Sequence, residues 1–301
     1  MADLVKKQIA GVCFTTETDA SIKLKGPGVH YESFIGGGDE GPAGIDIKIR
    51  VELGNMPNMK DLKEVFSAGQ AWSMYRDGQD YWMALNPPAF KSPLWMAKMD
   101  RTFTRVVVCC SEELVSSRNG EILLSDPVCY PLDQILLMHI LAQRRGTLIH
   151  AAGIGHNGKG YLFPGKSGAG KTTLTRQLAV REDLELLSDD RMVIRGLNGA
   201  FRAFGTPWPG DAGIARNRSL PLSGILFIKH GSSNRIKDIT PREALERLLP
   251  VTSIPWYDGD MIPPILSFFE DLMSHVPVYE FSFKPGIELI EVFESFAGAE
   301  P

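Results

Sequence analysis

The stretch YLFPGKSGAGKTTLTRQL, residues 161–178, decides the fold of the C-terminal half of the chain. Its Gly165, Gly170, Lys171 and Thr172 fit the phosphate-loop pattern G-x-x-x-x-G-K-[ST]. The loop follows an apolar run, expected to be a strand, and precedes a run expected to be a helix over residues 171–180. Because the motif requires this strand–loop–helix context, the stretch predicts a site for nucleotide phosphates.

The residue types of the loop explain the expected chemistry. Glycines allow a tight backbone that turns its N–H groups inward, and the positive end of the following helix dipole adds to the attraction for phosphate. Lys171 is expected to reach the β- and γ-phosphates of ATP, and Thr172 to offer its hydroxyl to Mg²⁺. The expected nucleotide-binding residues are Gly165, Lys166, Ser167, Gly168, Ala169, Gly170, Lys171, Thr172 and Thr173.

The composition is that of an ordinary globular protein of 301 residues, with 44% hydrophobic and 23% charged residues. A formal net charge of -4 gives no general reason to expect nucleic acid or a membrane surface as partner. The sequence shows no apolar run long enough for a signal peptide or a membrane span. We therefore expect a cytoplasmic protein whose four cysteines are reduced.

Two regions differ in pattern. We expect residues 1–130 to form a mostly antiparallel β domain, with substrate recognition as its candidate role, and residues 131–301 to form the catalytic α/β (α+β) domain with a mixed sheet. In the first region, GIDIKIRVEL at residues 44–53 alternates apolar and charged side chains, which predicts a half-buried antiparallel strand. Asp77-Gly78 lies between two aromatic-rich runs and predicts a tight hairpin.

A second hairpin precedes the phosphate loop. GTLIHAAGIG and KGYLFPG are joined by Asn157-Gly158, a strong signal for a two-residue turn, so we predict that residues 148–154 and 159–163 pair antiparallel. An antiparallel neighbour disfavours a GTPase or motor core, in which the strand before the loop lies among parallel neighbours. Gly153, Gly155 and Gly158 also match G-x-G-x-x-G, but another strand follows them, which argues against a dinucleotide site.

Three further side chains are candidates for the chemistry. Asp189 and Asp190 end an apolar strand soon after the loop, where one carboxylate can hold Mg²⁺ and the other can accept a proton from an attacking hydroxyl. His150 lies on the strand before the hairpin, where an imidazole can bind phosphate or change the pKa of a carboxylate.

The elements IHAAGI, GKSGAGKTT and SDDRMVI, in this order and spacing, resemble the HPr kinase/phosphorylase family, whose fold is similar to the nucleotide-binding core of phosphoenolpyruvate carboxykinase. TPWPGD, residues 206–211, looks like a signature of a divergent branch of kinases near peptide-modification genes. The resemblance implies transfer of the γ-phosphoryl of ATP to a serine hydroxyl. It implies Asp190 as proton acceptor, with His150 and Lys171 as further catalytic residues, and Thr172, Asp189 and Asp211 around the metal.

The resemblance covers about half of the chain and leaves the acceptor open as a peptide, a protein or a small molecule. One alternative is a nucleotide-binding regulatory module that has lost transfer; another is a small-molecule kinase of a different phosphate-loop type. The Asp189-Asp190 pair argues against the first and the antiparallel hairpin against the second. Neither nucleic acid nor a membrane is an expected partner, and assembly into a homo-oligomer is left open.

Overall fold

The computed structural model describes residues 4–36, 44–69, 71–118 and 120–299. They form two compact units, and the division falls after Ile140, inside a helix. Both units are built mainly of strands, in large mixed sheets. Across the described ranges, no helix has the length and apolar character needed to span a membrane.

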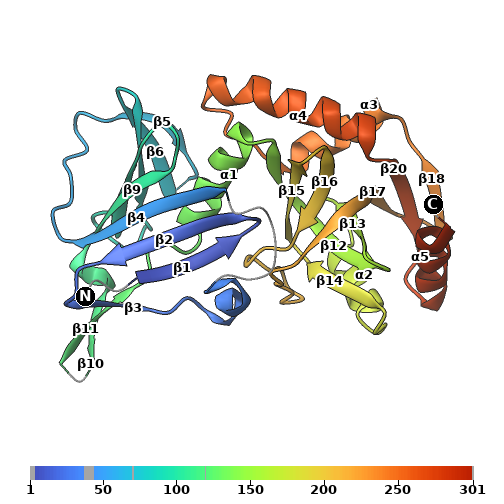
Figure 1. Cartoon of the computed structure of the whole chain (residues 1–301), viewed down its shortest axis with the longest axis horizontal. Helices are drawn as coiled ribbons and strands as arrows, with labels where there is room; N and C mark the ends of the chain where they lie inside the picture. Colours follow the sequence, from blue (N-terminus) through green and yellow to red (C-terminus); the bar gives the residue numbers. More distant parts are fainter. Residues whose placement is uncertain (1–3, 37–43, 70, 119, 300–301) are drawn as a thin grey trace. The chain divides into compact units, whose positions relative to one another are not determined.

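Unit 1 is organised by a sheet of eight strands among the described residues, in the order β1-β2-β4-β9-β8-β7-β6-β5 (Figure 1). The Asp77-Gly78 hairpin is confirmed, because the flanking strands pair antiparallel up to Asp77 and Asp80 and Gly78 has a φ of 60°. The strands are β1 (Leu4–Ile9), β2 (Val12–Thr18), β4 (Ile45–Leu53), β5 (Lys63–Ser67), β6 (Trp72–Asp77), β7 (Asp80–Leu85), β8 (Trp95–Met99) and β9 (Arg105–Cys110).

The strand at residues 44–53 differs from its prediction in one respect. Its inward side chains are buried and its outward ones are mostly exposed, as the alternation indicated. However, β4 pairs in parallel with both of its neighbours, β2 and β9, so the expectation of an antiparallel strand was wrong. The alternation reports only that one face of the strand is buried, and it carries no information about the direction of the neighbouring strands.

A smaller sheet and one helix complete unit 1. The helix α1 (Leu132–Gln143) begins in unit 1 and crosses the division. Its His139 is fully buried and stacks on Phe103 with ring centroids 4.0 Å apart, while its Nδ1 lies 2.9 Å from the carbonyl oxygen of Ile135. This histidine therefore belongs to the core. The remaining elements are β3 (Ile22–Lys25), β10 (Val115–Arg118), β11 (Glu121–Ser125) and the short 3₁₀ helices η1 (Val29–Phe34) and η2 (Glu112–Leu114).

Unit 2 contains the second large sheet, in which β12 (Gly146–His156) and β13 (Lys159–Pro164) form the predicted hairpin. Their antiparallel pairing runs from His156 and Lys159 to Ala151 and Pro164, which confirms the prediction. The other strands are β14 (Leu184–Ser188), β15 (Arg191–Leu197), β16 (Ala200–Phe204), β17 (Ser219–His230), β18 (Arg235–Asp238), β19 (Thr252–Ser253) and β20 (Val278–Phe283).

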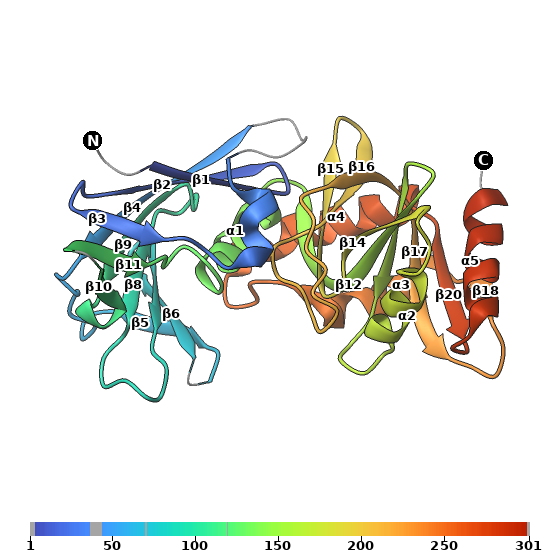
Figure 2. The same cartoon turned by 90° about the horizontal axis from the view of Figure 1, so that it is seen from below.

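Helices cover both faces of this sheet. On one face α2 and α5 bury Leu174 and Phe293 against β13 and β20, and on the other face α4 packs over β12 and β16 while α3 packs against β20 (Figures 1 and 2). The helices are α2 (Lys171–Leu178), α3 (Pro241–Leu248), α4 (Ile262–His275) and α5 (Ile287–Ala299), with 3₁₀ turns η3 (Leu249–Val251) and η4 (Gly259–Met261).

Three neighbouring strands of unit 2 run in the same direction, because β17 pairs in parallel with β13 and with β20. Ligands of open α/β sheets bind beyond the carboxyl ends of parallel strands, where loops and helix N-termini meet. The phosphate-loop sequence leaves β13 at this edge.

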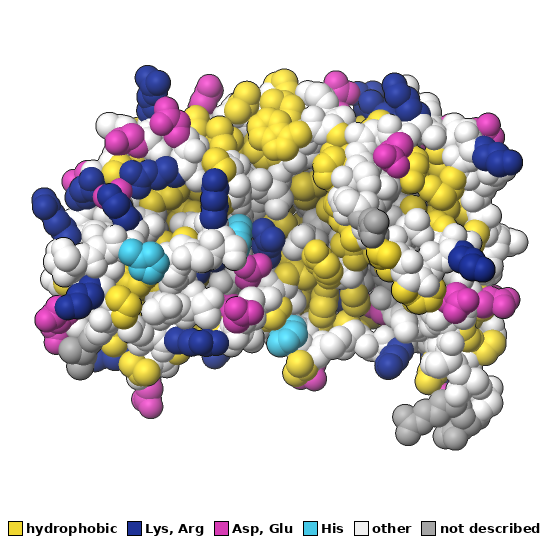
Figure 3. All heavy atoms as spheres, turned by 180° about the vertical axis from the view of Figure 1, so that it is seen from behind, with side chains coloured by type: hydrophobic (Ala, Val, Ile, Leu, Met, Phe, Trp, Pro, Cys, Tyr) yellow, Lys and Arg dark blue, Asp and Glu magenta, His cyan; other side chains and the backbone are white. Residues whose placement is uncertain are grey.

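On the face of the molecule seen in Figure 3, basic and acidic side chains are interspersed.

Candidate active site

The phosphate-loop sequence connects β13 directly to α2. Gly168 and Gly170 have φ angles of 80° and 103°, the left-handed region in which side chains are rarely accommodated. A Cβ atom on Gly170 would lie 2.6 Å from the Phe283 ring, and one on Gly165 would lie 2.8 Å from the Cβ of Ala169. The backbone angle therefore requires glycine at 168 and 170, and close packing favours it at 165 and 170.

Lys171, the first residue of α2, lies folded back over this loop. Its Nζ donates hydrogen bonds to the carbonyl oxygens of Gly165, at 2.8 Å, and of Lys166, at 3.3 Å. The side chain is buried, and this burial lowers its pKa, while the charge of Asp190 acts in the opposite direction. The ammonium group therefore lies against the loop backbone, and a rotation of the side chain would bring it to an anion bound there.

One pocket of about 380 Å³ joins the loop to the other predicted residues. It gathers side chains from the loop, from β12, from the turn between β14 and β15, and from a loop before β17. Of the predicted residues, Gly165, Lys166 and Ala169 are not in its wall. The lining consists of His150, Ser167, Gly168, Gly170, Lys171, Thr172, Thr173, Asp189, Asp190, Gly210 and Asp211.

His150 and Asp190 form a hydrogen-bonded pair in this pocket. The Nε2 of His150 lies 2.7 Å from Oδ1 of Asp190, and Nε of Arg191 lies 3.2 Å from Oδ2 of the same carboxylate. The backbone aligns them, since the Ala151 N–H donates to the carbonyl oxygen of Asp190 at 2.9 Å. Burial by itself raises the pKa of Asp190, but the His150 hydrogen bond and the Arg191 charge outweigh it and the pKa lies below its usual value.

Asp189 is engaged differently, with backbone rather than side chains. It is almost fully buried, and its carboxylate accepts N–H groups from Gly210 at 2.9 Å, Ala212 at 2.7 Å and Ile214 at 3.1 Å. These bonds hold the segment that carries Asp211 against the turn between β14 and β15. The acidic pair therefore has two distinct environments, one facing a histidine and an arginine and the other facing a loop backbone.

Every residue that lines this pocket falls within one family match. A family model described as SynChlorMet cassette protein ScmC matches residues 109–259, half of the chain. The chain belongs to the ScmC family. No curated protein matches this ScmC-family chain. A solved structure titled "Structure of the Hpr(Ser) kinase/phosphatase from Coxiella burnetii" matches 50% of it and 88% of that chain, at 13% identity and a TM-score of 0.28.

The structure also places residues in this ScmC-family site that the motifs did not single out. Arg191 follows the acidic pair and contacts Asp190, and Gly210 lies inside the TPWPGD stretch against Asp189. Arg191 could have been found from its position in SDDR, because a cation next to a carboxylate pair is a candidate partner for it. Nothing in the sequence indicated that the Gly210 backbone would contact Asp189.

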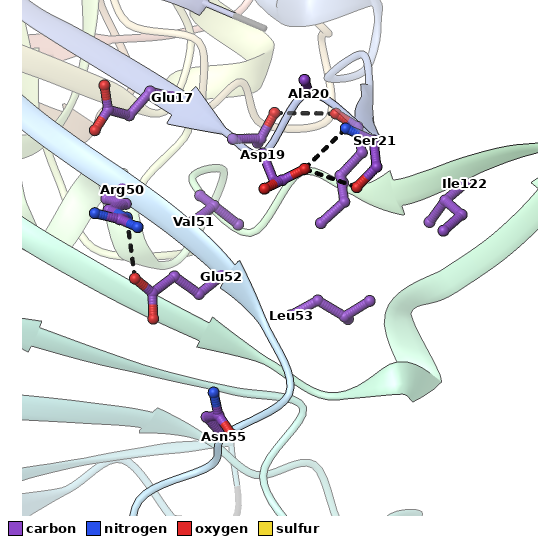
Figure 4. A pocket seen from close by; sticks show the side chains of 12 residues that line it. Glu17, Asp19, Ala20, Ser21, Arg50, Val51, Glu52, Leu53, Asn55 and Ile122 are labelled. Atoms are coloured by element: carbon purple, nitrogen blue, oxygen red, sulfur yellow. Dashed lines mark hydrogen bonds and ion pairs between the residues drawn. The ribbon is translucent and has the colours of Figure 1, made fainter. Parts of the chain in front are cut away.

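A larger hollow, of about 720 Å³, lies in unit 1 (Figure 4). Its lining combines acidic side chains with an apolar part formed by residues such as Val51 and Leu53. Three of its charged side chains have local partners, because Arg50 pairs with Glu52 at 3.0 Å and Asp19 accepts both the N–H and the hydroxyl of Ser21. Although this cavity is larger than the phosphate-loop pocket, it holds none of the predicted site residues.

Proposed function

We propose that the chain is an ATP-dependent phosphotransferase that moves the γ-phosphoryl group of ATP to a hydroxyl group. The acceptor we put first is a serine of a peptide or protein, followed by a small-molecule hydroxyl. One observation carries the proposal: a single pocket brings a glycine-shaped phosphate loop together with the His150–Asp190 pair. Phosphoryl transfer depends mainly on positioning and charge neutralisation, and these residue types supply both.

The loop would bind the triphosphate. Its N–H groups and the N-terminus of α2 attract the phosphate oxygens, and Lys171 exchanges the carbonyl oxygens of Gly165 and Lys166 for those of the β- and γ-phosphates. This exchange favours binding, because a charge-assisted bond to phosphate is stronger than one to a neutral carbonyl.

The oxygen groups of the pocket fit Mg²⁺, which prefers one or two carboxylates together with substrate phosphates. Thr172 offers a hydroxyl and Asp211 offers a carboxylate, while Asp189 also lies in the pocket wall. No group of three or more His, Cys, Asp or Glu side chains forms a metal cluster in the described ranges, so phosphate oxygens would have to complete the shell. When bound, Mg²⁺ would neutralise charge on the β- and γ-phosphates.

Asp190 would receive the proton of the acceptor hydroxyl as its oxygen bonds to phosphorus and the bond to the leaving ADP breaks. The lowered pKa of Asp190 keeps it ionised and able to orient the hydroxyl. In phosphoryl transfer with a loose transition state the attacking oxygen gains little charge early, so an orienting base of modest strength is sufficient. His150 would hold the carboxylate in place and contact the phosphoryl group in transit.

The alternative is a nucleotide-binding regulatory module without transfer. One observation favours it: both oxygens of Asp190 already have cationic or imidazole partners, as in a structural ion pair. The two functions differ in whether ATP is consumed. A transferase turns over ATP when an acceptor is present, whereas a regulatory module binds ATP and releases it unchanged.

The test is incubation with isotopically labelled ATP and Mg²⁺ against candidate peptides and metabolites, with mass spectrometry of the products. We expect labelled phosphate on an acceptor hydroxyl with the wild-type chain and strongly reduced labelling with Asp190→Asn. Asp183→Asn is the matched control, since Asp183 is exposed and pairs with Arg181 away from the pocket. Equal labelling by wild type and Asp190→Asn would exclude the role given to Asp190, and ATP binding without consumption would favour the regulatory module.

A further inference from the structure

The carboxylate of Asp189 is nearly saturated with backbone donors. A carboxylate offers about four lone-pair sites, and three are taken by the N–H groups of Gly210, Ala212 and Ile214. Its side chain is only 2% exposed, so it presents little free surface to the pocket. This pattern, alternate N–H groups of one short segment converging on one anion, is that of an anchor for a loop.

The segment that Asp189 holds is shaped for this contact. A Cβ atom on Gly210 would lie 3.0 Å from Oδ2 of Asp189, so the backbone approaches more closely than a side chain readily allows. Gly213 has a φ of 71°, and its N–H closes a turn onto the carbonyl oxygen of Gly210 at 3.1 Å. Both glycines bend the chain so that the alternate N–H groups of residues 210, 212 and 214 turn toward the same carboxylate.

The ends of the segment are fixed to the same turn. The Thr206 hydroxyl donates to the carbonyl oxygen of Arg191 at 2.7 Å, and the Arg216 N–H donates to that of Leu187 at 3.1 Å. Ala215 forms an isolated β-bridge with Ser188. With both ends fixed beside the acidic pair, Asp189 determines the course of the middle of the loop.

Asp211 lies in that middle, between two of the three donors. It lines the same pocket as Thr172, and its side chain makes no hydrogen bond or ion pair with the described part of the chain. Asp190, by contrast, is occupied by His150 and Arg191. Of the three carboxylates in the pocket wall, Asp211 is therefore the one left to face a ligand.

We infer that Asp189 is a positioning residue: it holds the 210–214 loop so that Asp211, and not Asp189 itself, presents its carboxylate to the cation that accompanies the nucleotide. The inference rests on the proposed function for the identity of the ligand, but the loop anchoring is a property of the chain alone. It changes the roles that the sequence suggested, since Asp189 and Asp211 were both expected to bind the metal.

The first test needs no nucleotide. Hydrogen–deuterium exchange of Asp189→Asn should show faster exchange of the amides of residues 210–214 than in wild type. The expected factor is roughly tenfold, the effect of losing a hydrogen bond to a charged acceptor. Exchange in α2 should be unchanged, and Asp183→Asn should behave like wild type. Unchanged exchange at 210–214 in a folded Asp189→Asn protein overturns the anchoring role.

The second test separates positioning from direct ligation. In a double-mutant cycle with Asp211→Asn, Mg²⁺-dependent ATP affinity measured by calorimetry should fall for each single variant, and Asp189→Asn should add little once Asp211 is changed. Losses that multiply instead would make Asp189 a separate ligand and overturn the inference. Gly210→Ala disturbs the same contact from the loop side, and it replaces Asp189→Asn if that variant does not fold.

The anchoring of the 210–214 loop by Asp189 and the proposed phosphotransferase function can fail separately. If the wild-type chain does not bind Mg·ATP but the loop still loosens in Asp189→Asn, the proposed function fails and the anchoring stands. If Mg·ATP binds and the loop is unaffected, the anchoring fails while the nucleotide site on which the proposed function depends stands.

Discussion

Nε2 of His150 lies 2.7 Å from Oδ1 of Asp190; His150 belongs to β12, and Asp190 immediately precedes β15, the strand that pairs with β12. His150 is opposite Arg191 in that register, so the imidazole, the carboxylate and the guanidinium are brought together by the sheet itself. The arrangement sets the charge of the pocket wall that faces the phosphate loop.

The pKa of Asp190 should depend on His150. Removing the imidazole in His150→Ala deletes the hydrogen bond that lowers the pKa and leaves the burial that raises it. The pKa should therefore rise, and ¹³C NMR titration of the Asp190 carboxyl in wild type and variant measures the change. His275→Ala, which alters an exposed histidine on α4, is the control. An unchanged Asp190 pKa in His150→Ala would show that the pair does not interact in solution.

Asp190→Asn should reduce turnover by about 10²–10⁴-fold, the usual contribution of a positioned general base. The amide keeps the size of the side chain but cannot accept the proton. Mg·ATP affinity should change little, because the loop, Lys171 and Asp211 remain. Steady-state rates and calorimetry on the same preparations separate the two quantities. Loss of Mg·ATP binding together with turnover would instead make Asp190 part of the metal site.

The hairpin and the loop could be predicted because local chemistry determines them. Asn157-Gly158 supplies positive φ angles, 51° and 76°, which only a few residue types tolerate, and the loop glycines do the same. The direction of β4 could not be predicted, since the pairing of β2, β4 and β9 is decided by connections rather than by the alternation within one strand.

Nor could the different environments of Asp189 and Asp190 be predicted. The two residues are adjacent in sequence, but one points to a loop some twenty residues further along the chain and the other to the neighbouring strand. Contacts at that separation depend on the folded course of the 206–216 segment. Sequence therefore indicated which residues gather at the site, and only the structure indicated what each of them contacts.

Unit 1 contains a buried carboxyl whose titration should affect stability. Asp133 accepts the hydroxyl of Tyr31 at 2.8 Å. Burial raises its pKa to about 6, although the charge of Lys7 opposes the rise. Because this pKa is above the usual 3.8, the folded state binds the proton more tightly than the unfolded state does. The contribution of Asp133 to stability is thus present below pH 4 and is lost as the pH rises toward 6.

Asp133→Asn stays neutral at every pH and should remove this dependence. Relative to the variant, the wild-type free energy of unfolding should fall by roughly 2 kcal/mol between pH 4.5 and 7. Urea unfolding of both proteins at the two pH values measures the difference. A wild-type value that rises relative to the variant over this range would mean that Asp133 is held ionised, by Lys7 or by its hydrogen-bond donors.

Calorimetric titration of Mg·ATP into wild type and Lys171→Ala tests the nucleotide site most directly. Wild type should bind, and Lys171→Ala should lose most of its affinity, by about 10- to 100-fold, the range for a hydrogen bond to a charged group. Lys48→Ala, which removes an exposed lysine on β4, should bind like wild type. Equal affinity of wild type and Lys171→Ala, or no binding by wild type, would contradict the assignment of residues 165–173 as a phosphate-binding loop.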